Sequence, residues 1–419
     1  MARSVIGISG ASVLAQGLTL AVSPILTRLY DPSAFGVFAY VSAIVVIVAV
    51  TAGLRMEMAI PICGADAEAG KVARLALLIA TVVSIGLLVL VPVLGPRIDE
   101  RTSLDLMPTL WLAPPSVLML AAFTIVSQLS IRMRDFRAVA RRNLTQAWSA
   151  AILQVAFAAT SNASGLLAGQ MAGRGFAAGL LSWRNRALLR ARTPERYRDL
   201  LRSFWRFPLV FTPAALLNTL GLTLPIIMVG GWFGAASAGQ LDLASRIVLG
   251  PAVLLGAAVS QVLLGEMAAR RRDESGPMAP LFRMVAIRLT LVAVPFAILV
   301  MVAAPTLFPV VFGEPWSQAG QDARLIAPAA AVSLVAGPLS QVFFVYQQGT
   351  RLIIVDALQV SLVIGAGWLA FWKTGNEGIV LSAIFGALAV SQGVSLWVCW
   401  RIVKAADLGQ AEDVGGGAE

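Results

Sequence analysis

The chain has 419 residues, of which 58% are hydrophobic and 13% charged, and its formal net charge is +10. Soluble domains contain about 25% charged residues, so this composition is typical of a protein that crosses a membrane several times. The sequence contains no histidine and two cysteines, which excludes histidine-based acid–base catalysis and histidine-ligated metal sites. We therefore expect no catalytic residues, no metal site and no bound cofactor.

Apolar stretches alternate with short loops from one end of the chain to the other. Each stretch reaches or approaches the ~20 residues that a helix needs to cross about 30 Å of hydrocarbon. The weakest is 144–160, which contains Gln146, Ser149 and Gln154. The pattern predicts an all-α polytopic membrane protein with twelve transmembrane helices, at residues 4–26, 35–53, 75–95, 107–130, 144–160, 166–183, 208–230, 239–264, 284–311, 325–345, 353–372 and 378–400.

The basic residues are concentrated in every second loop. Of the 32 lysines and arginines, 24 lie at the two termini or in even-numbered loops and only 4 lie in odd-numbered loops. Because Lys and Arg near helix ends resist translocation, this asymmetry predicts that both termini face the cytoplasm. It also accounts for most of the positive charge, so we do not expect nucleic acid as a partner.

The sequence also predicts two related halves. A basic segment at 184–206 separates six stretches from six, and the residues Gly-Leu-Thr-Leu at 17–20 recur at 221–224. We predict pseudo-symmetric six-helix lobes at 1–183 and 207–403, joined by this segment, with a cytoplasmic tail at 404–419. The basic segment is either a solvated linker or an amphipathic helix that lies on the membrane.

Arg174 is the strongest candidate for a functional residue, because it falls near the middle of the sixth stretch. A central arginine costs about 2.5–3.5 kcal/mol on insertion scales, so it normally faces the protein interior or water. Gln170 lies one turn earlier on the same face. Arg174 either binds carbonyl groups of a broken helix or lines a cavity for an anionic ligand. Small-residue pairs at 169/173 and 175/179 predict close helix packing here.

Further polar residues lie within the predicted spans. Asp242 and Arg246 are four residues apart, which suits an internal ion pair, a proton-carrying acid or a ligand-binding arginine. Asn218, Gln261 and Gln341 could bind sugar hydroxyls or join helices. Arg288 and Arg324 are expected to extend from helix ends toward the membrane surface.

Several segments together resemble bacterial polysaccharide-biosynthesis flippases, a branch of the multidrug/oligosaccharidyl-lipid/polysaccharide (MOP) exporter superfamily. The resemblance is found at residues 25–38, 54–60, 245–251, 258–262, 312–320, 326–328 and 337–345. It implies two six-helix lobes around a central cavity that works by alternating access. It adds Arg28, Arg55 and Glu57 to the candidate site and implies that Arg174 and Arg246 receive a diphosphate or acidic sugars.

The implied substrate is an undecaprenyl-diphosphate-linked oligosaccharide, moved from the inner to the outer leaflet of a bacterial cytoplasmic (inner) membrane. The expected partners are this lipid-linked oligosaccharide, membrane lipids and other polysaccharide assembly proteins, and a coupling ion, H⁺ or Na⁺, remains open. The alternatives are a multidrug antiporter of the same superfamily, a membrane enzyme of polysaccharide assembly, and a scaffold that transports nothing.

Overall fold

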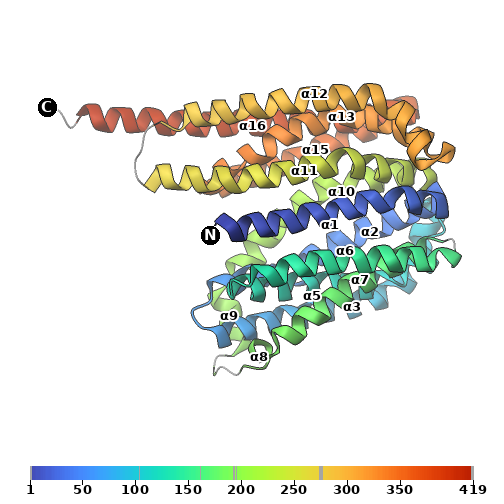
Figure 1. Cartoon of the computed structure of the whole chain (residues 1–419), viewed down its shortest axis with the longest axis horizontal. Coiled ribbons are helices and arrows are strands. Elements are labelled where there is room, and N and C mark those ends of the chain that lie inside the picture. The colour runs from blue at the N-terminus through green and yellow to red at the C-terminus, as the bar shows by residue number, and fades with distance from the viewer. Residues whose placement is uncertain are drawn as a thin grey trace. The chain divides into compact units, whose positions relative to one another are not determined.

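The computed structural model describes residues 2–102, 104–160, 162–191, 194, 196–272 and 277–416, and in these residues it contains helices and no strand (Figure 1). The helices of the N-terminal half are α1 (Ala2–Leu29), α2 (Pro32–Ala52), η1 (Met56–Ile62), α3 (Asp66–Thr102), α4 (Met107–Leu110), α5 (Ala113–Arg132), α6 (Phe136–Ala156), η2 (Phe157–Thr160), α7 (Ala163–Arg184), α8 (Arg186–Arg190) and α9 (Tyr197–Ser203). Those of the C-terminal half are η3 (Phe207–Phe211), α10 (Thr212–Phe233), α11 (Ala235–Arg272), α12 (Ala279–Phe312), η4 (Glu314–Trp316), α13 (Ser317–Leu339), α14 (Gln341–Val345), α15 (Gly349–Thr374) and α16 (Glu377–Gly416).

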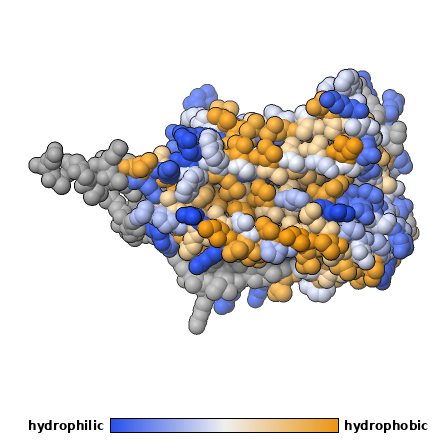
Figure 2. Space-filling view, turned by 90° about the horizontal axis from the view of Figure 1, so that it is seen from above, coloured by the Kyte–Doolittle hydropathy of each residue, from blue (hydrophilic) through white to orange (hydrophobic). Residues whose placement is uncertain are grey.

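Each of the twelve predicted stretches coincides with one of these helices or with two consecutive ones, which confirms the all-α prediction. Within the described residues, nine spans are long and apolar enough to cross a membrane. The other three predicted spans, α1, α6 and α7, are helices of 28, 21 and 22 residues. On the face shown in Figure 2, hydrophobic residues fill the middle and hydrophilic ones gather toward the ends.

The chain divides into two compact units. The first comprises Met1–Asp242 with Val311–Trp316, and the second comprises Leu243–Val310 with Ser317–Glu419. Helix α10 belongs to the first unit because it packs along α2. These units therefore differ from the two lobes expected from the sequence, whose symmetry and boundaries stay a prediction.

These three helices pack together in the first unit, with α6 lying along both α1 and α7 (Figure 1). The hydroxyl of Tyr30 donates a hydrogen bond to the carbonyl of Gln154 at 2.7 Å, and the Gln154 amide donates to the carbonyl of Leu166 at 3.1 Å. A polar group in hydrocarbon needs such a partner, because no water is there to replace it. This explains why the weakest predicted span still forms a helix.

Glycines bring α7 close to its neighbours. A Cβ atom on Gly169 would lie 2.7 Å from the backbone nitrogen of Gln154, and one on Gly173 would lie 2.8 Å from that of Ala150. The first predicted small-residue pair therefore sits at a helix contact. In the second pair, Gly175 approaches α5, whereas a Cβ on Gly179 would meet nothing within 4 Å.

The basic segment packs against the first unit. Its short helices α8 and α9 both contact α3, and Leu200 of α9 is buried. Arg74 of α3 donates a hydrogen bond to the carbonyl of Ala191 at 2.6 Å, and the ammonium group of Lys71 lies 5.3 Å from the centre of the Tyr197 ring. The described part of this segment is thus a docked pair of short helices, and neither sequence interpretation anticipated it.

The second unit has its own core. Helix α16 packs against α13 and α15, and its cluster of buried side chains includes Leu339 and Phe343. The amide of Gln392 donates a hydrogen bond to the Oε1 atom of Gln359 at 2.9 Å, so two polar side chains satisfy each other between α15 and α16.

The glycine contact predicts an effect on stability. We expect Gly173→Val to destabilise the protein by about 1–3 kcal/mol, because the new side chain overlaps the α6 backbone. The measurement is the thermal midpoint of the detergent-purified protein. Gly179→Val is the matched control, since its side chain enters open space; equal midpoints for the two variants would contradict the close contact.

Candidate functional site

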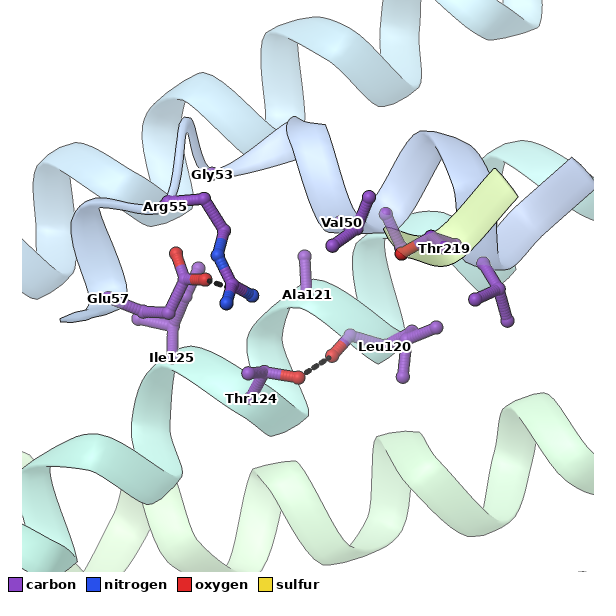
Figure 3. A pocket seen from close by; sticks show the side chains of 11 residues that line it. Val50, Gly53, Arg55, Glu57, Leu120, Ala121, Thr124, Ile125 and Thr219 are labelled. Atoms are coloured by element: carbon purple, nitrogen blue, oxygen red, sulfur yellow. Dashed lines mark hydrogen bonds and ion pairs between the residues drawn. The ribbon is translucent and has the colours of Figure 1, made fainter. Parts of the chain in front are cut away.

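A cavity of about 170 Å³ in the first unit contains two of the predicted site residues, Arg55 and Glu57 (Figure 3). They come from the connection between α2 and α3. The remaining walls come from the end of α2, from α5 and from Thr219 of α10. Most of these wall residues are apolar, so the arginine, the carboxylate and two threonines supply the polar chemistry.

The chain makes a tight turn where it enters this site. Leu54 and Arg55 have φ angles of 49° and 54°, a left-handed conformation that costs about 1–2 kcal/mol for each non-glycine residue. Backbone hydrogen bonds close the turn, from the N–H of Leu54 to the carbonyl of Thr51 and from that of Met56 to that of Gly53. The turn places Arg55 and Glu57 on the same side of η1, facing the cavity.

Arg132 at the end of α5 anchors the segment that follows. Its Nη1 atom donates hydrogen bonds to the carbonyls of Ile60, Pro61 and Cys63, at 3.2, 3.4 and 2.7 Å. Its Nε atom lies 2.8 Å from Oδ1 of Asp66 at the start of α3. A guanidinium is suited to this role, because its donors are held in a rigid plane. One side chain therefore satisfies three carbonyls at the end of η1 and links them to the start of α3.

Arg55 and Glu57 form an ion pair across the cavity, with Nη1 and Oε1 3.4 Å apart (Figure 3). The Glu57 side chain is only 7% exposed, whereas that of Arg55 is 23% exposed. The Nε atom of Arg55 is buried and has no hydrogen-bond partner. The arginine therefore keeps donor capacity that a hydroxyl or phosphate oxygen could fill.

Burial controls the protonation of Glu57, which lies between two membrane-spanning helices. Desolvation raises the pKa of its carboxyl above the usual 4.5, although a backbone hydrogen bond and the charge of Arg55 act in the opposite direction. The carboxyl of Glu57 is therefore harder to ionise in this cavity than in water.

Arg174 and Gln170 lie together elsewhere in the first unit, one turn apart on α7. Both are half-buried, as expected for polar residues that avoid lipid. The Oε1 atom of Gln170 is buried and has no hydrogen-bond partner. A buried acceptor without a partner is costly, and a ligand hydroxyl or N–H would relieve that cost. Neither residue lines the cavity that contains Arg55.

The other predicted residues are spread over both units. In the first, Asp242 is buried, whereas Arg28 and Asn218 are exposed. In the second, Arg246 and Gln341 are half-buried and Gln261 is exposed. Arg288 and Arg324 are also exposed. Among the predicted residues, Arg55 therefore forms an ion pair with Glu57, and Arg174 lies one turn from Gln170 on α7.

Sequence reasoning missed three residues of interest. Thr124 and Thr219 line the cavity, and their positions inside apolar stretches were the available signal. The third is Asp322, which is fully buried in the second unit and accepts a 3.1 Å hydrogen bond from Gln318. The sequence placed it in a loop, whereas α13 begins at Ser317.

Comparisons with known proteins agree on one class of membrane protein. The sequence model of a family described as polysaccharide biosynthesis protein matches residues 25–321. A search of curated protein sequences found no match. Among solved structures, the lipid II flippase MurJ in an inward closed conformation aligns with a TM-score of 0.74 and 12% identity, over 95% of this chain and 87% of that chain.

Two further structures extend this likeness. An inward-facing multidrug resistance MATE family transporter of the MOP superfamily aligns with a TM-score of 0.70 and 12% identity, over 96% of both chains. A MOP superfamily transporter from Pyrococcus furiosus, described by the reverse polarity of its binding pocket, aligns with a TM-score of 0.67 and 14% identity, over 96% of both chains. At such identities the likeness shows the fold alone, and that fold is the twelve-helix fold of these transporters.

The anchoring role of Arg132 can be tested by a conservative change. We expect Arg132→Lys to destabilise the protein by about 1.5–3 kcal/mol, because an ammonium group cannot pair the carbonyls and Asp66 together. The measurement is the thermal midpoint in detergent. Arg137→Lys is the matched control at an exposed position, the second residue of α6. If the two variants have equal midpoints, the anchor contributes nothing.

The buried carboxyl predicts a pH dependence. Because the pKa of Glu57 is raised in the folded state, ionisation is harder there than in the unfolded chain. Its contribution is therefore most favourable below about pH 4.5 and is lost as the pH rises through the folded pKa. We expect Glu57→Gln to gain stability relative to the wild type as the pH increases, measured by thermal midpoints from about pH 4 to about pH 8. A difference that is constant with pH would contradict this.

Proposed function

Because the chain belongs to the polysaccharide biosynthesis protein family of the MOP transporter superfamily, we propose that it flips lipid-linked oligosaccharides across a membrane. In this proposal the substrate is an undecaprenyl-diphosphate-linked repeat unit of O-antigen, capsule or exopolysaccharide. It moves from the inner to the outer leaflet of the bacterial cytoplasmic membrane by alternating access. The chain acts as a transporter with no covalent step of its own.

Physical chemistry explains why such a substrate needs a protein. A diphosphate with sugar hydroxyls cannot enter hydrocarbon unaided, since desolvating its charges and polar groups costs many kcal/mol. A polar path with fixed positive charge replaces that hydration, while the prenyl tail stays in lipid. The family description names polysaccharide biosynthesis, and one structural neighbour is named as a lipid II flippase. Both the family description and the name of this neighbour are consistent with a lipid-linked sugar as the transported substrate.

The observation that carries the proposal is the buried acceptor of Gln170 beside Arg174. An arginine and an amide one turn apart on a helix offer charge for a diphosphate and hydrogen bonds for sugar hydroxyls. Arg55, which has a buried donor free of partners, offers a second contact of the same chemistry. We assign Arg174 and Arg246 to the diphosphate or acidic sugars, and Asn218, Gln261 and Gln341 to hydroxyl groups.

A multidrug antiporter is the second candidate. Two buried carboxylates in the first unit, Glu57 and Asp242, favour it, because an acid that binds and releases H⁺ or Na⁺ could couple export to an ion gradient. An antiporter predicts resistance to cationic drugs, whereas a flippase predicts loss of surface polysaccharide when the gene is deleted.

Replacing the central arginine tests the flippase proposal. We expect Arg174→Ala to reduce surface polysaccharide by about tenfold or more, because one charge-assisted hydrogen bond contributes about 1.5–3 kcal/mol. The lipid-linked glycan should accumulate in the inner leaflet while the amount of membrane-inserted protein stays unchanged. Arg288→Ala, at an exposed position, is the control. A fully active Arg174→Ala variant would refute the role of this charge.

A further inference from the structure

A second, strongly basic pocket lies in the first unit where α6 begins and α7 ends. It has a volume of about 340 Å³. The charged and aromatic residues that line it are Arg141, Arg142, Trp183, Arg184 and Arg186. The rest of its wall is apolar. No residue of this pocket lines the cavity around Arg55 or belongs to the predicted substrate site.

Two of the four arginines are held in place by the surrounding structure. Arg184 donates to Oδ2 of Asp135 through Nε and Nη2, at 2.9 and 2.5 Å. The other oxygen of Asp135 accepts a hydrogen bond from the N–H of Ala138 and so caps α6. Arg142 lies with its guanidinium carbon 4.1 Å from the centre of the Phe123 ring.

The pocket is left with uncompensated positive charge. Asp135 is the acid that pairs with Arg184, and within the described residues no carboxylate forms an ion pair with Arg141, Arg142 or Arg186. Arg186 instead lies over the ring of Trp183, 5.0 Å from its centre. Three guanidinium groups around one cavity repel one another, and an anion between them would relieve that repulsion.

Apolar side chains run along both helices from this pocket. On α7, Phe176, Leu180 and Trp183 share a face and are 62%, 49% and 66% exposed. On α6, exposed Trp148 and Ile152 lie on the same helical face as Arg141. The surface thus joins positive charge at the helix ends with apolar contact along the helices. Such a surface is complementary to an anionic amphiphile, which has a negative headgroup and an apolar tail.

We propose that this pocket binds the phosphate headgroup of an anionic membrane phospholipid, whose acyl chains lie along the exposed faces of α6 and α7. Basic pockets between membrane helices take such headgroups, and guanidinium groups match phosphate oxygens in geometry and charge. The substrate's own diphosphate is the rival source of the same chemistry. At 100° per residue, however, the face with Phe176 and Leu180 is turned by about 120° from the one with Arg174 and Gln170. The phospholipid that surrounds the protein reaches this outer face directly.

The test removes charge from the pocket without touching its buried parts. Arg141→Gln combined with Arg186→Gln changes two exposed side chains, so folding should be preserved. Native mass spectrometry of the full-length protein would count bound cardiolipin or phosphatidylglycerol, with phosphatidylcholine as the uncharged comparison. We expect about thirty-fold weaker binding of the anionic lipids, from two lost phosphate contacts, and no change for phosphatidylcholine.

A control variant separates this site from general positive charge. Arg190→Gln with Arg198→Gln removes the same charge from exposed positions in the basic segment that do not line the pocket. It should bind the anionic lipids as the wild type does. The proposal is overturned if both double variants lose binding equally or if neither does. It is also overturned if undecaprenyl diphosphate displaces the phospholipid from the wild type, because the pocket would then belong to the substrate.

Discussion

The structure depends on one constraint, namely that hydrocarbon offers no hydrogen bonds to a polar group. Most helices of the chain meet it with apolar side chains and need little else. Helices α6 and α7 carry polar side chains along their length, and they pack closely against each other. Tyr30, Gln154 and the carbonyl of Leu166 form a chain of hydrogen bonds across this part of the first unit, and Gly169 and Gly173 permit the close approach. Arg174 lies on one of these two closely packed helices.

The same constraint explains the break between α2 and α3. The end of a short helix leaves carbonyls unpaired, and here Arg132 supplies donors to three carbonyls at the end of η1. With its backbone fixed in this way, the segment can hold a strained turn and direct Arg55 and Glu57 into a cavity. The donors of Arg132 bind residues that follow this turn, and on the cavity side the Nε donor of Arg55 has no hydrogen-bond partner. Irregular backbone and candidate function therefore occur together.

The arginines of this chain have several different structural roles, which the sequence by itself does not distinguish. Arg132 and Arg74 satisfy backbone carbonyls, Arg184 pairs with a helix-capping aspartate, and Arg55 faces a cavity beside an acid. Their neighbours distinguish them. Arg55 lines the cavity between α2, α5 and α10, whereas Arg141, Arg142 and Arg186 line the separate pocket where α6 begins and α7 ends. Their location therefore separates the cavity around Arg55 from the proposed phospholipid pocket.

The sequence by itself determined the twelve helices and the class of protein, because hydrophobic length and family motifs are local properties of the chain. It also drew attention to Arg174 and Gln170 through the cost of burying polar groups, and to Arg55 and Glu57 through the family resemblance. Only the tertiary structure decided that Arg55 meets Glu57, that Asp322 is buried in a helix, and that α10 packs with the first unit. The Arg55–Glu57 pair depends on the left-handed turn at residues 54 and 55. The burial of Asp322 and the packing of α10 depend on contacts between segments distant in sequence, and no periodicity or spacing records which distant segment will supply a partner.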